Sequence, residues 1–216
     1  MKFNPDSPFF EFMNTLAAFI GLNVLFLITC LPIVTIGPAL SALYTVTLKE
    51  ARKEQGYIFS TYLKAFKKNF PQSAAAFLIQ LVLAFIFVFN AVFWGEQNTV
   101  SGNICMFLMT LLLVVLAFSF LYTFPLLARF QNSLKQTLKN SVAIAVTHPK
   151  TTLGLLAIQA VFIIACIAVP QAKIFMVLLG FAFDAYCNSL LLTRLFPYMK
   201  TIRKHSLCYP DMVSSF

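Results

Sequence analysis

A long uncharged stretch interrupted by two prolines constrains the fold of this chain more than any other feature. Residues 12–48 carry no charged side chain, and Pro32 and Pro38 interrupt them. About 20 residues cross the hydrocarbon core of a bilayer as a helix, so this stretch is too long for one span and too short for two spans with a turn. Proline disfavours helix in the residue before it and donates no backbone hydrogen bond. A break is therefore predicted around residues 31–37, with a new helix beginning at Pro38.

The composition of the remaining chain also indicates a membrane protein. Sixty per cent of the residues are hydrophobic and only 11% are charged, outside the range of soluble domains. The hydropathy pattern predicts an all-α fold: a polytopic membrane helix bundle of about five transmembrane helices in a single domain, residues 1–216. The predicted spans are 12–35, 72–94, 103–128, 151–169 and 174–193. The segments predicted to be cytoplasmic are 38–70, 129–150 and 194–216, the first of which includes an amphipathic basic helix over 57–70 that ends where Pro71 opens the second span.

The basic residues predict the orientation of these spans. Of the 16 Lys and Arg residues, 14 fall in the three segments predicted to be cytoplasmic. Short loops rich in Lys and Arg stay on the cytoplasmic side, so we expect an external N-terminus and a cytoplasmic C-terminus in a bacterial cell membrane. The net charge of +9 then reflects topology and contact with anionic membrane lipids. No nucleic-acid-reading motif accompanies this charge, so no nucleic-acid partner is predicted.

The broken segment carries a recognisable pattern. Pro32, Thr35, Gly37 and Pro38 form P-x-x-T-x-G-P within LPIVTIGPALSALY, and a basic segment ending in KKNFPQS follows. This arrangement resembles the YesL-type family of bacterial membrane proteins over most of the chain. The resemblance implies a small multi-span protein encoded beside carbohydrate-uptake ABC importers and glycoside hydrolases in Gram-positive bacteria. It implies no biochemical activity.

A second, shorter resemblance follows the break. Glu50, Ala51, Arg52 and Gly56 are similar to the E-A-A-x-x-x-G cytoplasmic coupling loop of ABC importer permeases, which docks into the ATPase. The chain departs from that pattern at Arg52, and the element precedes the second span rather than lying late in the chain. The alternative interpretation is a solvent-exposed helix end with Gly56 as its C-cap.

Several polar residues fall inside the predicted spans. Asp184 is the only charge within a span, and a carboxylate in hydrocarbon is costly unless it is paired or neutralised. The expected partners are Asn188, one helical turn away, and Gln80 or Gln159 across the bundle. Either a proton or substrate contact or a structural hydrogen-bonding acid would explain Asp184.

No catalytic motif, metal-ligand spacing or cofactor signature is present in the sequence, so the chain is predicted not to be an enzyme. The preferred hypothesis is an accessory or regulatory membrane subunit that binds the permease subunits of a carbohydrate ABC importer through transmembrane helices. Small residues such as Ala74–Ala76 and Gly154 would permit close approach of a partner helix. The alternatives are a stand-alone small transporter or channel that uses Asp184, Gln80 and Gln159, and a membrane sensor or scaffold.

Overall fold

The regular elements of the protein are helical. The computed structural model describes residues 8–54, 56–97, 99–130, 133–168 and 176–208. The elements are α1 (Pro8–Thr29), the 3₁₀ turn η1 (Ile33–Thr35), α2 (Ile36–Ala51), α3 (Ile58–Gly95), α4 (Val100–Arg129), α5 (Leu134–Thr147), α6 (Pro149–Ala168), the π-helical turn η2 (Met176–Gly180) and α8 (Phe181–Cys208). None of these described residues lies in a strand, and the predicted all-α class is confirmed.

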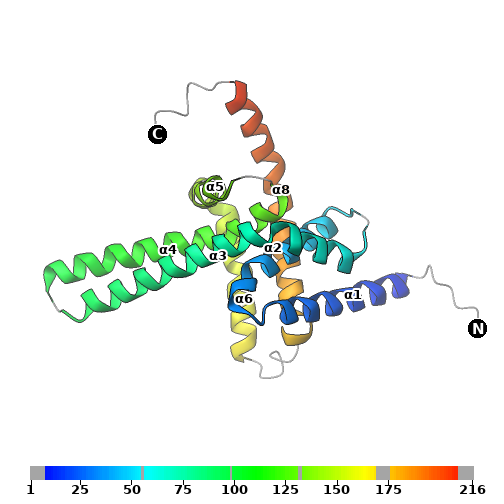
Figure 1. The fold of residues 1–216 in the computed structure, drawn as a ribbon, viewed down its shortest axis with the longest axis horizontal. Helices are drawn as coiled ribbons and strands as arrows, with labels where there is room; N and C mark the ends of the chain where they lie inside the picture. Colours follow the sequence, from blue (N-terminus) through cyan, green and yellow to red (C-terminus); the bar gives the residue numbers. More distant parts are fainter. Residues whose placement is uncertain (1–7, 55, 98, 131–132, 169–175, 209–216) are drawn as a thin grey trace, which may run out of the picture.

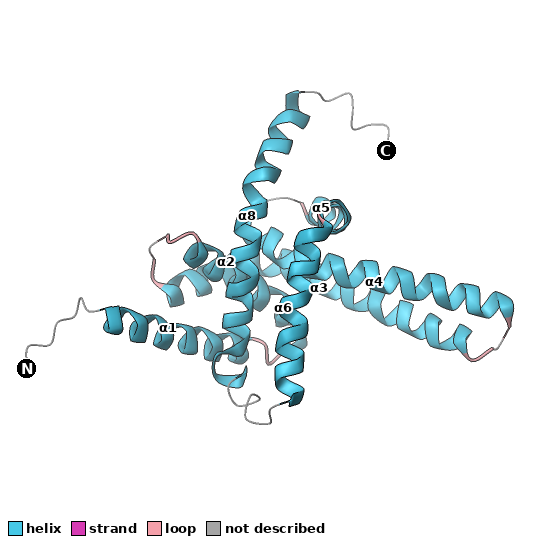
Figure 2. Ribbon diagram, turned by 180° about the vertical axis from the view of Figure 1, so that it is seen from behind, coloured by secondary structure: helices cyan, strands magenta, loops and turns pink. Residues whose placement is uncertain are grey.

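The helices radiate from a central region. In Figure 1, α3 and α4 lie side by side as a long hairpin that extends away from the other helices, and α1 extends toward the opposite side. The helices α6 and α8 run across this direction, and the short helix α2 lies where the others meet. Figure 2 shows the same arrangement from behind. The centre of the fold is therefore the surroundings of α2.

Within the described residues, three helices are long and apolar enough to cross a membrane: α3, α4 and α6. Residues 15–29 of α1 form a shorter apolar helix. The helices α3, α4 and α6 are apolar helices at the positions of the predicted spans 72–94, 103–128 and 151–169, although residue 169 lies outside the described residues. The predicted fifth span, 174–193, begins outside the described residues and continues as η2 and the first half of α8. Residues 209–216 of the predicted cytoplasmic tail also lie outside them.

The predicted break after the first helix is present, but α1 ends earlier than expected, at Thr29 rather than residue 35. The reason is a set of hydrogen bonds that satisfies the backbone groups freed by the break. The Thr35 hydroxyl donates to the carbonyl oxygens of Thr29 at 2.6 Å and Pro32 at 2.7 Å. The Thr29 hydroxyl in turn hydrogen-bonds to the Tyr62 hydroxyl of α3. The Thr35 hydroxyl thus supplies a hydrogen-bond donor to backbone carbonyls that have lost their partners at the end of the helix. In a membrane such backbone groups must be satisfied within the protein.

Helix α2 begins at Ile36, which puts Pro38 in its first turn as predicted. Gly37 faces α3 so closely that a Cβ atom added there would lie 2.3 Å from the Ser73 carbonyl oxygen and 2.7 Å from Phe77 Cβ. Only glycine permits this approach of two helix backbones, which explains the glycine of the P-x-x-T-x-G-P pattern.

Three clusters of buried apolar residues form the core, and α2 takes part in each of them. Ala39, Leu43 and Val46 pack with α1, α3 and the start of α8. Leu48 packs with α4, α5, α6 and α8. Leu40 packs against the cluster shared by α3 and α4. Small and apolar side chains therefore make α2 the helix that joins all parts of the fold.

The prediction that Pro71 opens a new span is wrong, because α3 runs without interruption from Ile58 to Gly95 and contains Pro71. An internal proline removes one backbone hydrogen bond, and packing of the helix on both sides can offset that loss. Here Ala65, Ser73 and Phe77 are all buried, and Gly37 holds α2 against the turn that follows the proline. The predicted amphipathic helix and the predicted second span are one helix of 38 residues.

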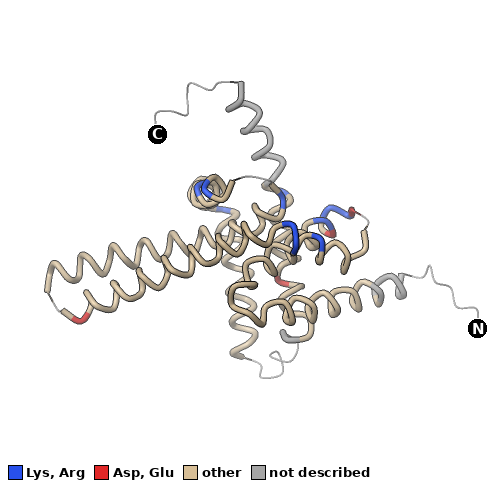
Figure 3. Tube along the Cα trace, in the orientation of Figure 1, with Lys and Arg blue, Asp and Glu red and all other residues tan. Residues whose placement is uncertain are grey.

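The described basic residues gather in one region of the fold. In Figure 3, lysine and arginine lie around α5, the end of α2 and the first half of α3, and the far end of the α3–α4 hairpin has none among its described residues. Loops that are distant in sequence thus bring their cations together, as a common membrane face requires.

Substitution of Gly37 by alanine should destabilise the protein. Alanine normally favours a helix over glycine by up to about 1 kcal/mol. At this position the new methyl group would meet the Ser73 carbonyl, and overpacking of this kind costs about 1–3 kcal/mol. We expect a lower melting temperature in detergent. The matched control is Gly56→Ala, where the nearest atom, Thr61 Oγ1, would lie at 3.6 Å. A Gly37→Ala protein that melts at or above the wild-type temperature would contradict the close crossing.

Candidate functional site

Asp184 lies between α6 and α8, where two amide side chains surround its carboxylate. Gln159 Nε2 donates to Oδ1 at 3.0 Å and to Oδ2 at 2.9 Å, and Asn188 Nδ2 donates to Oδ2 at 3.1 Å. Asp184 is half-buried, and Asn188 is buried. No ion pair to Asp184 forms within the described part of the chain. Two of the three expected partners therefore contact the acid.

Gln80, the third expected partner, belongs to a different cluster. It is buried on α3, and its Nε2 donates to Thr123 Oγ1 at 3.0 Å and Ser119 Oγ at 3.4 Å, both on α4. The Ser119 hydroxyl also forms a hydrogen bond of 2.7 Å with the hydroxyl of Ser141 on α5. This cluster joins α3, α4 and α5, whereas the Asp184 cluster joins α6 and α8.

The separation of the two clusters bears on the transporter hypothesis. A polar path that used Gln80, Gln159 and Asp184 together would need them to line one space. Instead, each glutamine directs its Nε2 to hydroxyl or carboxylate partners on a neighbouring helix. Hydrogen bonds of this kind join helices inside a bilayer. The arrangement favours an architectural role for both clusters.

The segment similar to a coupling loop forms the end of α2 and the turn after it. The helix ends at Ala51, and Lys53 takes the left-handed backbone conformation with φ of 57°. The amide of Lys53 donates to the Glu50 carbonyl at 2.8 Å, and that of Glu54 donates to the Lys49 carbonyl at 3.0 Å, which is the Schellman pattern of a helix C-terminus. The interpretation of Gly56 as the C-cap is therefore wrong, because the cap forms three residues earlier.

Arg52 is engaged within the same turn. Its Nε donates to the Leu48 carbonyl at 3.0 Å, and its Nη1 pairs with Glu54 Oε1 at 3.2 Å. Gly56 is exposed after this turn. The four residues compared with the coupling loop thus form a helix end and an exposed connection at the basic side of the fold.

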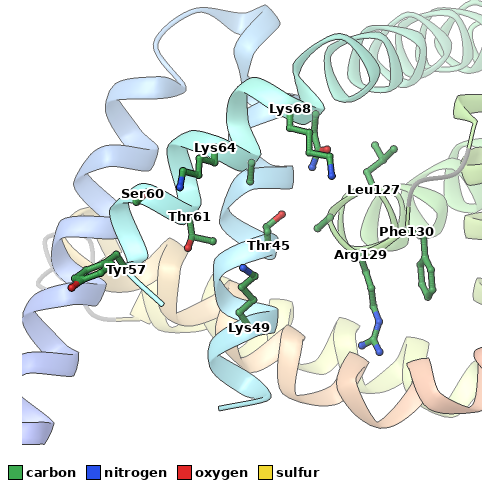
Figure 4. A pocket seen from close by; sticks show the side chains of 13 residues that line it. Thr45, Lys49, Tyr57, Ser60, Thr61, Lys64, Lys68, Leu127, Arg129 and Phe130 are labelled. Carbon is green, nitrogen blue, oxygen red and sulfur yellow. The ribbon is translucent and has the colours of Figure 1, made fainter. Parts of the chain in front are cut away.

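A cavity that the sequence did not predict lies next to this turn. It has a volume of about 470 Å³ and opens between the end of α2, the start of α3 and the end of α4. Four cationic side chains line it, together with hydroxyl, amide and apolar groups: Lys49, Lys64, Lys68 and Arg129. Figure 4 shows Lys68 pointing toward Leu127, and Lys49 pointing along α2 toward Thr45, with Lys64 further along α3. We call it the basic cavity.

Sequence reasoning missed the basic cavity because its cations come from three separate segments. Each segment alone has the composition of an ordinary cytoplasmic loop. The one local signal is the spacing of Lys64 and Lys68, which puts both on one face of α3, while Lys67 does not line the cavity.

The fold and its long apolar helices define the chain as a helical membrane protein. Comparison with known proteins shows which proteins the chain is similar to. The family profile described as "Protein of unknown function, DUF624" matches residues 19–91, which run from α1 through the break and α2 into α3. The chain is 29% identical over 173 residues to "Uncharacterized protein YesL" of Bacillus subtilis (strain 168), a match that covers 80% of this chain and 78% of that protein. These two matches confirm the resemblance to the YesL-type family. No solved structure matches the chain.

Two substitutions of Asp184 should differ in their effect on stability. In Asp184→Asn the new amide keeps one acceptor, and a rotation of the Gln159 amide supplies an acceptor for the new donor. Asp184→Leu leaves the amide donors of Gln159 and Asn188 without their acceptor, at a cost of about 1–2 kcal/mol. We expect a clearly lower melting temperature for the leucine variant alone. Phe183→Leu, on an exposed neighbouring position, serves as the control. Equal melting of the leucine and asparagine variants would contradict the structural role.

Proposed function

We propose that the protein is a non-enzymatic accessory subunit that binds the permease subunits of a carbohydrate ABC importer in the bacterial cell membrane. The observation that supports this proposal most directly is the outer half of the α3–α4 hairpin. Most of its side chains are apolar, with Asn90 and Thr110 among the exceptions, and neither helix buries more than 17% of its most apolar segment inside the fold. The hairpin thus offers a long helical surface for contact with lipid or with other transmembrane helices.

One face of the hairpin has the character of a helix-packing surface. Phe85, Phe89 and Phe93 recur every four residues on α3 and are 73%, 62% and 51% exposed. Residues at this spacing form a continuous row along a helix. We call this row the aromatic stripe. Large side chains that project from a helix fit into the grooves of a partner helix, and van der Waals packing of this kind drives helix association in lipid.

The small residues first expected at the partner surface are used elsewhere. Ala74 and Ala76 are buried where α3 packs inside the fold, and Gly154 lies close to Leu191 of α8. The prediction that a partner helix approaches at those residues is therefore wrong. The aromatic stripe replaces it as the proposed site of contact with a permease helix.

The choice of an importer permease as the partner rests on the family resemblance. YesL-type proteins are typically encoded beside carbohydrate-uptake ABC importers, and a subunit that works through helix packing needs no catalytic group of its own. The end of α2, Glu50–Arg52, lies on the basic side of the fold and adds a second contact region toward the ATPase side of such an importer. The two separate polar clusters give less support to a stand-alone transporter.

Co-purification in mild detergent tests the proposal. We expect the tagged protein to retain both permease subunits, including in high salt, because apolar contacts are not screened. Replacement of the aromatic stripe by three alanines should reduce recovered permease several-fold. The same replacement of Ile163, Ile164 and Ile167, an exposed apolar set on α6, is the matched control. Absence of permease from the wild-type sample, or robust sugar uptake by liposomes that hold this protein alone, would overturn the proposal.

The proposed orientation has an independent test. In a variant whose native cysteines are replaced, single cysteines at Gln97 and Gln136 probe two exposed positions with the same starting side chain. A membrane-impermeant maleimide should label position 97 on intact cells and position 136 only after permeabilisation, because the basic segments stay in the cytoplasm. Labelling of position 136 on intact cells would reverse the topology.

A further inference from the structure

We propose that the basic cavity binds a phosphate-bearing anion at the cytoplasmic surface of the membrane. The first argument is its charge. Lys49, Lys64 and Lys68 come from α2 and α3, Arg129 ends α4, and none of the described residues that line the cavity is acidic. A concave site lined by charges of one sign focuses the electrostatic potential and attracts the opposite charge.

Two acidic groups lie beside the basic cavity without lining it. Glu50 and Glu54 line a smaller adjacent cavity of about 10 Å³, which shares Lys49 with the larger one. Glu54 forms the ion pair with Arg52 described above. No ion pair involves Lys64 or Lys68 within the described part of the chain. The lysines of α3 are thus available to compensate an external negative charge.

The second argument is the set of donors around the cations. The side chains of Thr61 and Ser60 of α3 line the same cavity. Thr45 of α2 also lines it, but its hydroxyl already donates to the Ser41 carbonyl at 2.8 Å. Lysine ammonium groups and hydroxyl groups together suit the several acceptor oxygens of a phosphate. The Arg129 guanidinium carbon lies 5.8 Å from the centroid of the Phe130 ring, and its side chain points away from Lys68 (Figure 4).

The third argument is position and size. A volume of about 470 Å³ lies within the range of small-ligand sites. Leu127 and Phe130 give one wall an apolar surface. The apolar part of α3 begins at Ala74, less than two helical turns after Lys68. Basic pockets between helices at this depth suit the headgroups of anionic lipids. The same donors would hold a soluble phosphate ester, so the shared chemistry is the phosphate group.

The full-length protein in a neutral detergent tests this inference. The probes are phosphatidylglycerol, glycerol phosphate and inorganic phosphate, each compared with sodium chloride at equal ionic strength. The readout is the melting temperature as a function of probe concentration. We expect a saturable rise for the wild type with at least one probe. The double variant Lys64→Gln/Lys68→Gln should bind on the order of ten-fold more weakly, because each lysine near an anionic headgroup contributes measurably.

Lys67→Gln is the matched control, because Lys67 is exposed on the same helix and does not line the cavity. A response to glycerol phosphate or inorganic phosphate that the double variant loses and the control keeps would identify a soluble phosphate ligand. The same pattern with phosphatidylglycerol alone would identify a lipid headgroup. Equal responses in the wild type, the double variant and the control, or no response to any probe, would overturn the inference. This test is independent of whether an importer permease is the partner.

Discussion

The close approach of α2 to α3 at Gly37 determines how the rest of the chain packs. Because Gly37 has no side chain, the backbone of α2 lies against the Ser73 carbonyl of α3. This position lets one short helix reach all three apolar clusters of the core. This crossing requires the break before α2, because a helix that continued straight from α1 could not change direction to pack against α3. The hydrogen bonds of Thr35 make the break compatible with an apolar environment.

Polar contacts then join the helices that surround α2. In a bilayer the apolar surface of a helix gains little from burial, so packing and hydrogen bonds between helices carry more of the specificity. The Gln80 cluster holds α3, α4 and α5 together, and the Asp184 cluster holds α6 to α8. A hydrogen bond of 2.8 Å between Thr47 and Ser189 links α2 to α8. These polar residues within apolar helices thus have partners on neighbouring helices, and the outer surface of the hairpin is mostly apolar.

Sequence reasoning predicted the features that depend on local chemistry. The prolines and Thr35 located the break, and Pro38 located the first turn of α2. The spacing of Asp184 and Asn188 predicted a contact that is present. One error arose where a tertiary contact decides the outcome, and the other where a local turn forms earlier in the chain than expected. Pro71 was expected to begin a helix, but packing against α2 keeps α3 continuous around it. Gly56 was expected to cap α2, but Lys53 adopts the left-handed conformation first and completes the Schellman turn.

The sequence alone could not tell whether these lysines only set the membrane topology or also bind an anion, and the basic cavity shows why. Positive residues on one side of the membrane explain topology wherever they lie within a loop, so a count of lysines says nothing about their mutual positions. Folding places Lys49, Lys64 and Lys68 along one cavity and leaves Lys67 outside it. Cations around one cavity repel one another, and this cost falls only if solvent, salt or a bound anion screens them. Three lysines held around one concave space beside an apolar wall therefore favour occupation by an anion over a purely topological role for these residues.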